Sequence, residues 1–376
     1  MQYILTILVA LILSSRYSKT GDLRLLKLPY SVLCLWNILF FGLRYRVGLD
    51  TLNYMDNYWK ILPIDGLTIS DFMGLHHAPL YALLESICKT ISPEFWVLQI
   101  AVAAIFNIIL FIFLKKHSVN PYLSFAIYFF VTAPHFNTNL MRESLAIAMF
   151  LLNYDNYKER RWKKYYSMSL LSIGFHYSAF IILLFPLLRN IRFNKTFLWV
   201  VIAFSVFCAF FVGMLLPHLP SGIIYDEINR KIRRMGFYNI NWFIMHFIRY
   251  ALAPLLLLLL SRRYKLNELH ENILCIYLLL CVGIFFYEMF FVRFTNYLTI
   301  LLFIYIANYV KSRYVVFDYK MYVLIPLLAV NIWYYASRGH YENYYPYHSV
   351  FNPVEDDKRE LRRDRMIEES NSNVQM

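Results

Sequence analysis

Residues 28–51 read LPYSVLCLWNILFFGLRYRVGLDT, an apolar run that ends in two arginines and an aspartate. The run Leu28–Leu43 is typical of a membrane-spanning helix, which needs about 20 predominantly apolar residues. Arg44, Arg46 and Asp50 then lie where this helix leaves the membrane. The stretch therefore predicts a helical membrane protein with a charged site at one membrane surface.

The composition of the whole chain predicts an all-α, polytopic transmembrane helix bundle. Of its 376 residues, 59% are hydrophobic and 16% are charged, against about 25% charged residues in soluble domains. Apolar runs such as Leu255–Leu260 are continuous, whereas strands of a membrane β-barrel alternate apolar and polar residues. Tyr3–Leu13 has no basic residue before it, so we interpret it as a short first span rather than a cleavable signal peptide. We expect about 10 to 12 transmembrane helices, some of them broken or short.

The distribution of basic residues predicts the topology, because loops rich in lysine and arginine remain in the cytoplasm. Such clusters are Arg16–Lys27, Lys115–Lys116, Lys158–Lys164, Arg189–Lys195, Arg262–Lys265 and Lys311–Arg313. The segments expected outside are the N-terminus, 44–94, 134–142, the region of His176, 217–241, the region of Arg293 and the C-terminal tail. The net charge of +13 comes from these clusters, whose placement also favours attraction to anionic lipid headgroups. It does not indicate nucleic-acid binding.

Two further expectations concern organisation. We expect one integral-membrane domain over residues 1–352, followed by a charged and disordered tail over residues 353–376. The outer segment 217–241 carries Arg230, Lys231, Arg233 and Arg234 against the topology rule, so either it binds lipid phosphates or the topology differs there.

Several expected spans are short. Pro121–Ala133, Met141–Asn153 and the halves that flank His176 each hold about a dozen residues, against about 20 needed for a full crossing. Polar groups at such breaks are expected to line a functional cavity, because non-helical backbone at membrane depth survives only beside protein or water. The groups between the first two short spans are Pro134, Asn137, Asn139, Arg142 and Glu143.

The outer segment 44–93 contains an amphipathic stretch, Leu80–Ile91. Its apolar residues recur at helical spacing, and they are Leu80, Leu83, Leu84, Ile87 and Ile91. We therefore expect a helix that lies at the outer surface of the membrane.

No motif of a soluble enzyme is present, such as a phosphate-binding loop or a serine elbow. The scattered cysteines are expected to be small packing residues, and they are Cys34, Cys88, Cys208, Cys275 and Cys281. A metal at His76–His77 is the less favoured interpretation, because adjacent histidines do not share a helix face. We expect no metal and no cofactor.

Polar groups on the expected outer side remain as candidates for function: Arg44, Arg46, Asp50, Arg142, Glu143, His176 and Arg293. The planar fork of arginine binds phosphate through two parallel hydrogen bonds, so these arginines favour an anionic, membrane-held substrate. The alternative for each arginine is that its side chain extends to the lipid headgroups. His176 has the alternative of a packed, hydrogen-bonded histidine.

Tyrosines are abundant near the C-terminus, from Tyr334–Tyr335 to Tyr344–Tyr345 and Tyr347. Aromatic belts at the membrane surface are the ordinary explanation. A platform on which sugar rings stack is the alternative.

Five blocks of sequence together resemble the EpsG-like family of Wzy-type polysaccharide polymerases. The first block is Arg44, Gly48, Asp50, Thr51 and Tyr54, and the second is Met141–Ala146, in which Glu143 stands where the family commonly has Gln. The others are Phe175–Ala179, Arg293–Tyr297 and Tyr344–Tyr347. The resemblance covers about residues 30–350, and the order and spacing of the blocks carry it more than any single block does.

The resemblance implies a glycosyltransferase of the bacterial inner membrane whose active site faces the periplasm or the cell exterior. It would polymerise repeat units of exopolysaccharide, capsule or O-antigen. The donor would be an oligosaccharide on undecaprenyl diphosphate, and a flippase and a chain-length regulator would be protein partners. An acceptor hydroxyl would attack the anomeric carbon of the donor, with no metal and no nucleotide sugar.

The roles expected from this mechanism follow the residue types. Arg44, Arg46, Arg142 and Arg293 would hold the diphosphate. Asp50 would be the base, with His176 next, although an ion pair with Arg46 would lower the pKa of Asp50 and leave it an orienting role. Weaker glycan contacts are expected from Thr51, Tyr54, Glu143, Tyr297, Tyr345 and Tyr347.

Two other functions are weighed against the polymerase. A transporter or flippase for lipid-linked oligosaccharide would show inverted repeats and charges near the middle of the membrane, whereas these charges gather on one side. A membrane acyltransferase would place a histidine deep in a helix facing the cytoplasm, whereas His176 is expected outside.

Overall fold

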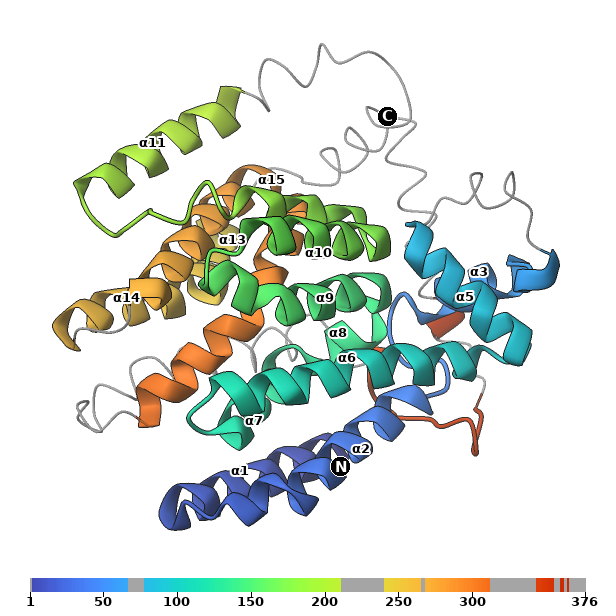
Figure 1. The fold of residues 1–376 in the computed structure, drawn as a ribbon. Coiled ribbons are helices and arrows are strands. Elements are labelled where there is room, and N and C mark those ends of the chain that lie inside the picture. Colours follow the sequence, from blue (N-terminus) through green and yellow to red (C-terminus); the bar gives the residue numbers. More distant parts are fainter. Residues whose placement is uncertain are drawn as a thin grey trace. The chain divides into compact units, whose positions relative to one another are not determined.

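The computed structural model describes residues 2–66, 78–210, 240–264, 268–311, 343–354, 359–361 and 364. Within these residues the chain forms helices joined by short connections (Figure 1), which confirms the expected all-α class. The chain divides into two compact units. The first unit comprises Met1–Pro186, Phe303–Ser312 and Tyr335–Glu355, and the second comprises the rest. A single domain over residues 1–352 stays a prediction.

Four helices among the described residues are long and apolar enough to cross a membrane: Leu23–Gly42, Phe95–His117, Glu268–Glu288 and Phe290–Val310. Shorter apolar helices are Pro121–Val131, Lys195–Phe210 and Phe243–Leu259. The chain is therefore a helical membrane protein. The short helix expected from Pro121 is confirmed, and the total number of spans stays a prediction.

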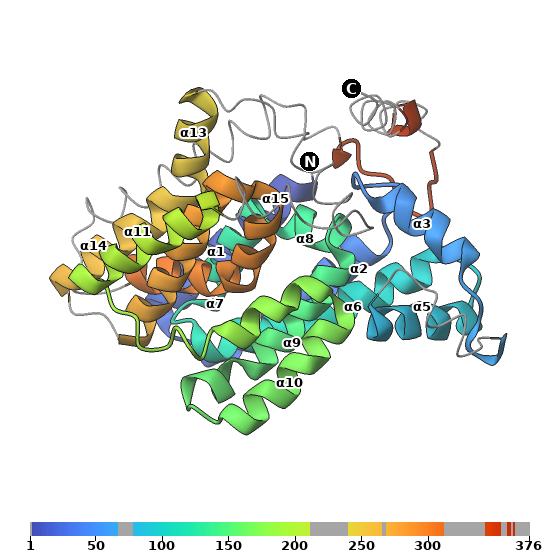
Figure 2. The ribbon, with the colours of Figure 1, turned by 90° about the horizontal axis from the view of Figure 1, so that it is seen from above.

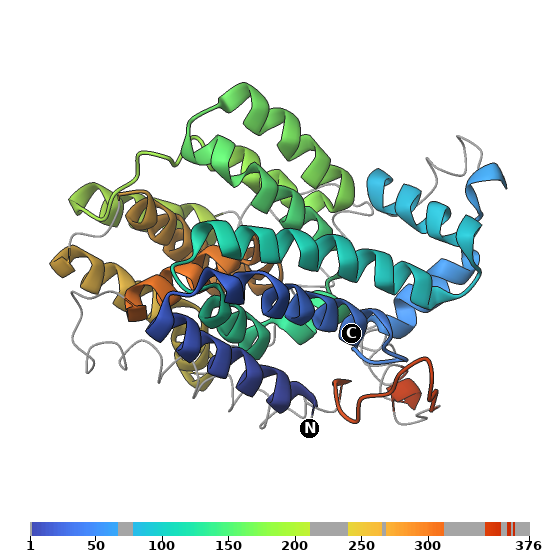
Figure 3. The ribbon, with the colours of Figure 1, turned by 60° about the horizontal axis from the view of Figure 1, so that its bottom comes forward.

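The first unit carries the following elements: α1 (Gln2–Thr20), η1 (Leu23–Leu26), α2 (Leu28–Gly42), α3 (Thr51–Lys60), η2 (Ile64–Gly66), α5 (Pro79–Ile91), α6 (Phe95–His117), α7 (Pro121–Val131), α8 (Ala133–Thr138), α9 (Met141–Lys158), α10 (Trp162–Phe175) and η3 (Tyr177–Leu184). The helix α5 confirms the helix expected over Leu80–Ile91. In the first unit, α2 packs on α6, α6 on α9, and α9 on α10 (Figure 3).

A chain of buried amides joins four of these helices. Asn37 of α2 donates to Asn107 of α6 over 2.6 Å, and Asn107 donates to Asn137 of α8 over 2.8 Å. Asn137 in turn donates to the Tyr128 hydroxyl of α7 over 2.7 Å. Polar groups inside a membrane find hydrogen-bond partners mainly in other protein groups. This series of hydrogen bonds therefore holds the break between α7 and α9 in place.

The second unit contains α11 (Lys195–Phe210), α13 (Ile240–His246), the π-helical segment η6 (Phe247–Leu252), α14 (Ala253–Tyr264) and most of α15 (Glu268–Lys311). Figure 2 labels α11, α13, α14 and α15. The helix α15 bends at Tyr287, whose backbone is non-helical with φ −152° and ψ 74°. His246 Nε2 lies 2.8 Å from Glu288 Oε1 near this bend. The bend separates the two membrane spans that α15 contains.

Candidate functional site

Arg44 lies in the loop between α2 and α3 and points into the first unit. Its side chain is 1% exposed, and its guanidinium donates to the Phe41 oxygen, to the Val47 oxygen over 3.2 Å and to the Met141 sulfur over 3.2 Å. These contacts close the C-terminal end of α2, whose last carbonyls have no partner within the helix. Burial lowers the pKa of Arg44 to about 10, so the guanidinium stays charged at neutral pH. Arg44 thus stabilises the loop through its own hydrogen bonds. Diphosphate binding by Arg44 stays a prediction.

Gly48 brings this loop against α8. Its backbone has φ +113°, and a Cβ atom there would lie 2.5 Å from Thr138 Cβ and 2.8 Å from Thr51 Oγ1. Only glycine accepts both this conformation and this approach. The Thr51 hydroxyl donates to the Val47 oxygen over 2.7 Å and is fully buried, so its observed contact is with the loop.

Asn139, just before the second sequence block, joins the first and last blocks. Its Oδ1 accepts from the Leu49 amide over 2.9 Å, and its backbone oxygen accepts from the Tyr54 hydroxyl over 3.0 Å. Its Nδ2 donates to the Tyr344 hydroxyl over 3.1 Å. The loop after α2, the turn before α9 and the C-terminal segment therefore meet at one amide.

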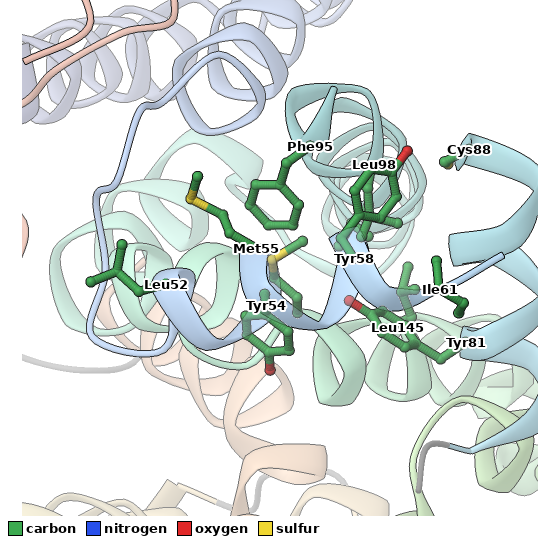
Figure 4. Close-up of a cluster of buried hydrophobic side chains, with 12 residues drawn as sticks. Leu52, Tyr54, Met55, Tyr58, Ile61, Tyr81, Cys88, Phe95, Leu98 and Leu145 are labelled. Carbon is green, nitrogen blue, oxygen red and sulfur yellow. The ribbon is translucent and has the colours of Figure 1, made fainter. Parts of the chain in front are cut away.

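Arg142 is the second residue of α9 and lies beside this junction. Its guanidinium carbon is 5.6 Å from the centre of the Tyr54 ring, in the range of a cation–π contact. The Tyr54 ring lies 6.5 Å from the ring of Tyr81 on α5. Figure 4 shows Tyr54 and Tyr81 within a buried apolar cluster that also includes Met141 and Leu145 of α9. The arginine is half-buried, so aromatic rings hold it at the edge of this cluster.

Asp50 and Arg46 lie in the same loop as Arg44, and both are half-buried. Asp50 precedes α3, and its backbone oxygen accepts from the Tyr54 amide over 3.0 Å, but its carboxylate does not cap the helix. Arg46 has φ +55°, and its guanidinium carbon lies 5.6 Å from the Tyr45 ring centre. The structure thus brings Arg44, Arg46 and Asp50 into one loop beside Arg142.

His176 lies between α10 and η3. Its Nδ1 accepts from the Ser178 amide over 3.2 Å and lies 2.7 Å from the Ser178 hydroxyl. The neutral ring therefore carries its proton on Nε2, the assignment that this acceptor role requires. In that tautomer His176 can donate a hydrogen bond through Nε2, which suits a donor better than a base.

The end of α10 lies against the start of α5. A Cβ atom at Gly174 would meet the Leu80 side chain at 2.6 Å, and Phe175 packs against the cluster that contains Met141. Since α9 and α10 form a hairpin, the His176 turn lies at the same end of that hairpin as Arg142. The second and third sequence blocks therefore share one end of the first unit.

The C-terminal segment Asn343–Val350 packs against the loop after α2 through backbone hydrogen bonds. Backbone hydrogen bonds run from Gly48 to Asn343, from Tyr45 to His348 and from Val350 to Leu43, over 2.8, 2.8 and 2.9 Å. The Tyr347 ring stacks on Phe40 with centres 4.6 Å apart, and its hydroxyl donates to the Phe40 oxygen over 2.8 Å. Tyr347 is thus a packing residue, whereas Tyr345 is 55% exposed and offers its ring to solvent.

The remaining candidates lie on α9, on α15 and outside the described residues. Arg293 is half-buried and Tyr297 fully buried on α15 in the second unit. The convergence of Arg293 with Arg142 and the glycan contact of Tyr297 stay predictions. Glu143 is 1% exposed and lies on α9 next to Arg142. His76–His77 lies outside the described residues, as does most of segment 217–241.

Sequence reasoning overlooked Tyr81 and Glu85 of α5. Glu85 is 1% exposed, although charged residues are rarely buried to this extent. The apolar pattern carries no signal for Glu85, because at helical spacing this residue lies well away from the side formed by Leu80, Leu84 and Ile87.

One protein family matches most of the chain. The EpsG family matches residues 27–349, a range that contains Arg44, Asn139, Arg142 and His176. No curated protein and no solved structure matches the chain.

Proposed function

Because the chain belongs to the EpsG family, we propose that it is an inner-membrane polymerase that joins lipid-diphosphate-linked oligosaccharide repeat units on the outer side of the membrane. Membership of this family supports a polysaccharide-polymerase-like role in general. The four apolar helices long enough to span a membrane fit a substrate that is itself held by a lipid.

The observation that carries this proposal is the junction at Asn139. It holds the loop of Arg46 and Asp50 beside Arg142, at the end of the unit where His176 also lies. Transfer of a glycan from a lipid diphosphate needs cationic donors for the leaving group and a proton acceptor for the attacking hydroxyl. This end of the first unit supplies both kinds of group.

In the proposed reaction, the acceptor hydroxyl forms a bond to the anomeric carbon of the donor while the bond from that carbon to the lipid diphosphate breaks. The hydroxyl proton passes to the base, and the electron pair of the broken bond stays on the diphosphate. Arg142 and Arg46 stabilise this developing charge, while Arg44 keeps the loop of Arg46 in shape. Asp50 is the proposed base, and His176 is a proposed donor to the diphosphate or the sugar.

The test compares Arg142→Lys and Arg142→Ala with the wild type in a host strain that lacks its own copy of the gene. Lysine keeps the charge but not the two-pronged donor, so we expect the surface polymer to shorten in the first variant and to collapse to single repeat units in the second. Arg161→Ala, at the other end of the α9–α10 hairpin, is the matched control and should give full-length polymer.

The same strains separate the polymerase from a transporter of lipid-linked oligosaccharide. A polymerase defect leaves lipid-linked single units in the outer leaflet, where an impermeant lectin or enzyme detects them. Loss of those units from the outer leaflet in Arg142→Ala would instead identify a transporter. Full-length polymer in Arg142→Ala would refute the site proposed here.

A further inference from the structure

Glu85 carries a buried carboxyl that has no role in the proposed reaction. Its side chain is 1% exposed, and among the described residues neither of its carboxyl oxygens has a hydrogen-bond partner. A buried polar group without a partner is costly, so such groups are rare and need an explanation. A carboxyl that remains neutral reduces this cost.

The positive charge of Arg142 acts on the Glu85 carboxyl. Burial raises the pKa of the Glu85 carboxyl to about 8, and the positive charge of Arg142 opposes part of this rise. Glu85 is therefore mainly neutral at pH 7. The guanidinium of Arg142 lies over the Tyr54 ring, and a neutral Glu85 does not offset its positive charge.

Other charged or titratable groups lie on the elements around Glu85. They are Tyr81, Cys88 and Lys89 on α5, Tyr54, Asp56, Tyr58 and Lys60 on α3, Asp65 on η2, Glu94 before α6, Arg142 and Glu143 on α9, and His176 after α10. Of these groups, Arg142 is the one whose charge shifts the pKa of Glu85. Burial raises the pKa of Tyr58, and the charges of Cys88, Glu85 and Glu94 raise it further. Lys89 lies over the Tyr58 ring at 4.9 Å from its centre.

We propose that Glu85 is a positioning residue that acts through Arg142: in its ionised form it competes with the diphosphate of the substrate for the guanidinium, and in its neutral form it does not. This inference rests on the proposed function, because it assumes that Arg142 binds the lipid diphosphate. It assigns to Glu85 the control of anion affinity and not the transfer of a proton to or from the substrate.

The direction of the pH dependence follows from the charge of each form. Below about pH 8 the carboxyl is mainly neutral, and the cationic site is intact. As the pH rises through this value, the proton leaves Glu85 and a negative charge faces Arg142. Because opposite charges interact strongly where water is excluded, we expect the affinity for a diphosphate to fall by about tenfold or more.

The experiment measures binding of undecaprenyl diphosphate to the purified full-length protein in lipid nanodiscs, from about pH 6 to about pH 10. Undecaprenol, which lacks the diphosphate, reports binding of the lipid tail alone. Wild-type affinity should fall on the alkaline side. Glu85→Gln, which is neutral at every pH, should bind as tightly as the wild type at pH 7 and keep that affinity on the alkaline side.

Two further variants control the measurement. Glu94→Gln, an exposed residue of the same region, should keep the wild-type profile. Glu85→Asp keeps a carboxyl of lower intrinsic pKa, so its midpoint should move to lower pH. This shift decides the matter if Glu85→Gln does not fold.

The outcomes separate the two proposals. If the wild type binds undecaprenyl diphosphate no better than undecaprenol, the diphosphate site of the proposed function is wrong, and the role of Glu85 falls with it. If the wild type binds but Glu85→Gln follows the same pH profile, or loses affinity at pH 7, the role of Glu85 alone is refuted.

Discussion

The amide nitrogen of Leu49 donates a hydrogen bond to Asn139 Oδ1 over 2.9 Å, although 90 positions separate the two residues. Leu49 belongs to the loop that carries Arg46 and Asp50, and Asn139 precedes the helix that carries Arg142. This contact is therefore the link between a candidate base and a candidate diphosphate ligand. The Tyr54 hydroxyl strengthens the link by donating to the Asn139 backbone oxygen.

Replacing Asn139 by Ala should loosen this link. The Leu49 amide and the Tyr344 hydroxyl would each lose a partner, and each such loss costs about 1 to 3 kcal/mol for a buried group. We expect a lower melting temperature and shorter surface polymer. Asn156→Ala is the matched control, since Asn156 bonds within the other end of the α9–α10 hairpin. Equal effects of the two variants would contradict the role of Asn139.

Gly48→Ala should be more damaging than an ordinary glycine substitution. The new Cβ would lie 2.5 Å from Thr138 Cβ, and the backbone has φ +113°, a conformation that costs other residues about 1 to 3 kcal/mol. We expect a reduced yield of folded protein and loss of polymer. Gly66→Ala, where a Cβ meets no atom within 4 Å, should behave as the wild type in both thermal unfolding and polymer assays.

The two tyrosines of the C-terminal segment should respond differently to replacement by Ala. Tyr347 stacks on Phe40 and donates a hydrogen bond to the Phe40 oxygen. Because Tyr347→Ala removes both contacts, it should lower the melting temperature. Tyr345 is exposed, so its loss should spare thermal stability and shorten the polymer if its ring contacts sugar. A polymer of normal length in Tyr345→Ala would remove this residue from the glycan site.

Changing Asp50 to Asn should collapse the surface polymer to single repeat units while the protein stays folded. The two side chains are nearly equal in size, and Asp50 makes no side-chain cap to α3, so the fold should tolerate the change. A positioned base contributes about 10² to 10⁴-fold in rate, which is enough to abolish visible polymer. Polymer length is measured on extracted polysaccharide.

His176→Gln distinguishes the two candidates for the base. Because His176 Nδ1 accepts from Ser178, we expect a milder loss than in Asp50→Asn. A severe loss in His176→Gln together with near-normal polymer in Asp50→Asn would transfer the role of the base to His176.

Several features of this protein are determined by sequence alone. Residues 28–42 form a membrane helix, Pro79–Ile91 an amphipathic helix and Pro121–Val131 a short helix, as the apolar patterns predict. Helical periodicity and apolar length are local properties of the chain, and the absence of water in the membrane leaves few alternatives to a helix. The five sequence blocks were likewise visible, because residue type and spacing carry them.

Only the tertiary structure decided how those residues are used. Arg44 was expected at a membrane surface, but its guanidinium turns inward to Phe41, Val47 and Met141. Glu85 was overlooked, although it faces the charge of Arg142 from another helix. Both outcomes depend on contacts between residues distant in sequence, since burial and the neighbouring charges set the energy of an ionisable group. No periodicity in the chain encodes those neighbours, so packing alone determined which of these charged groups are buried.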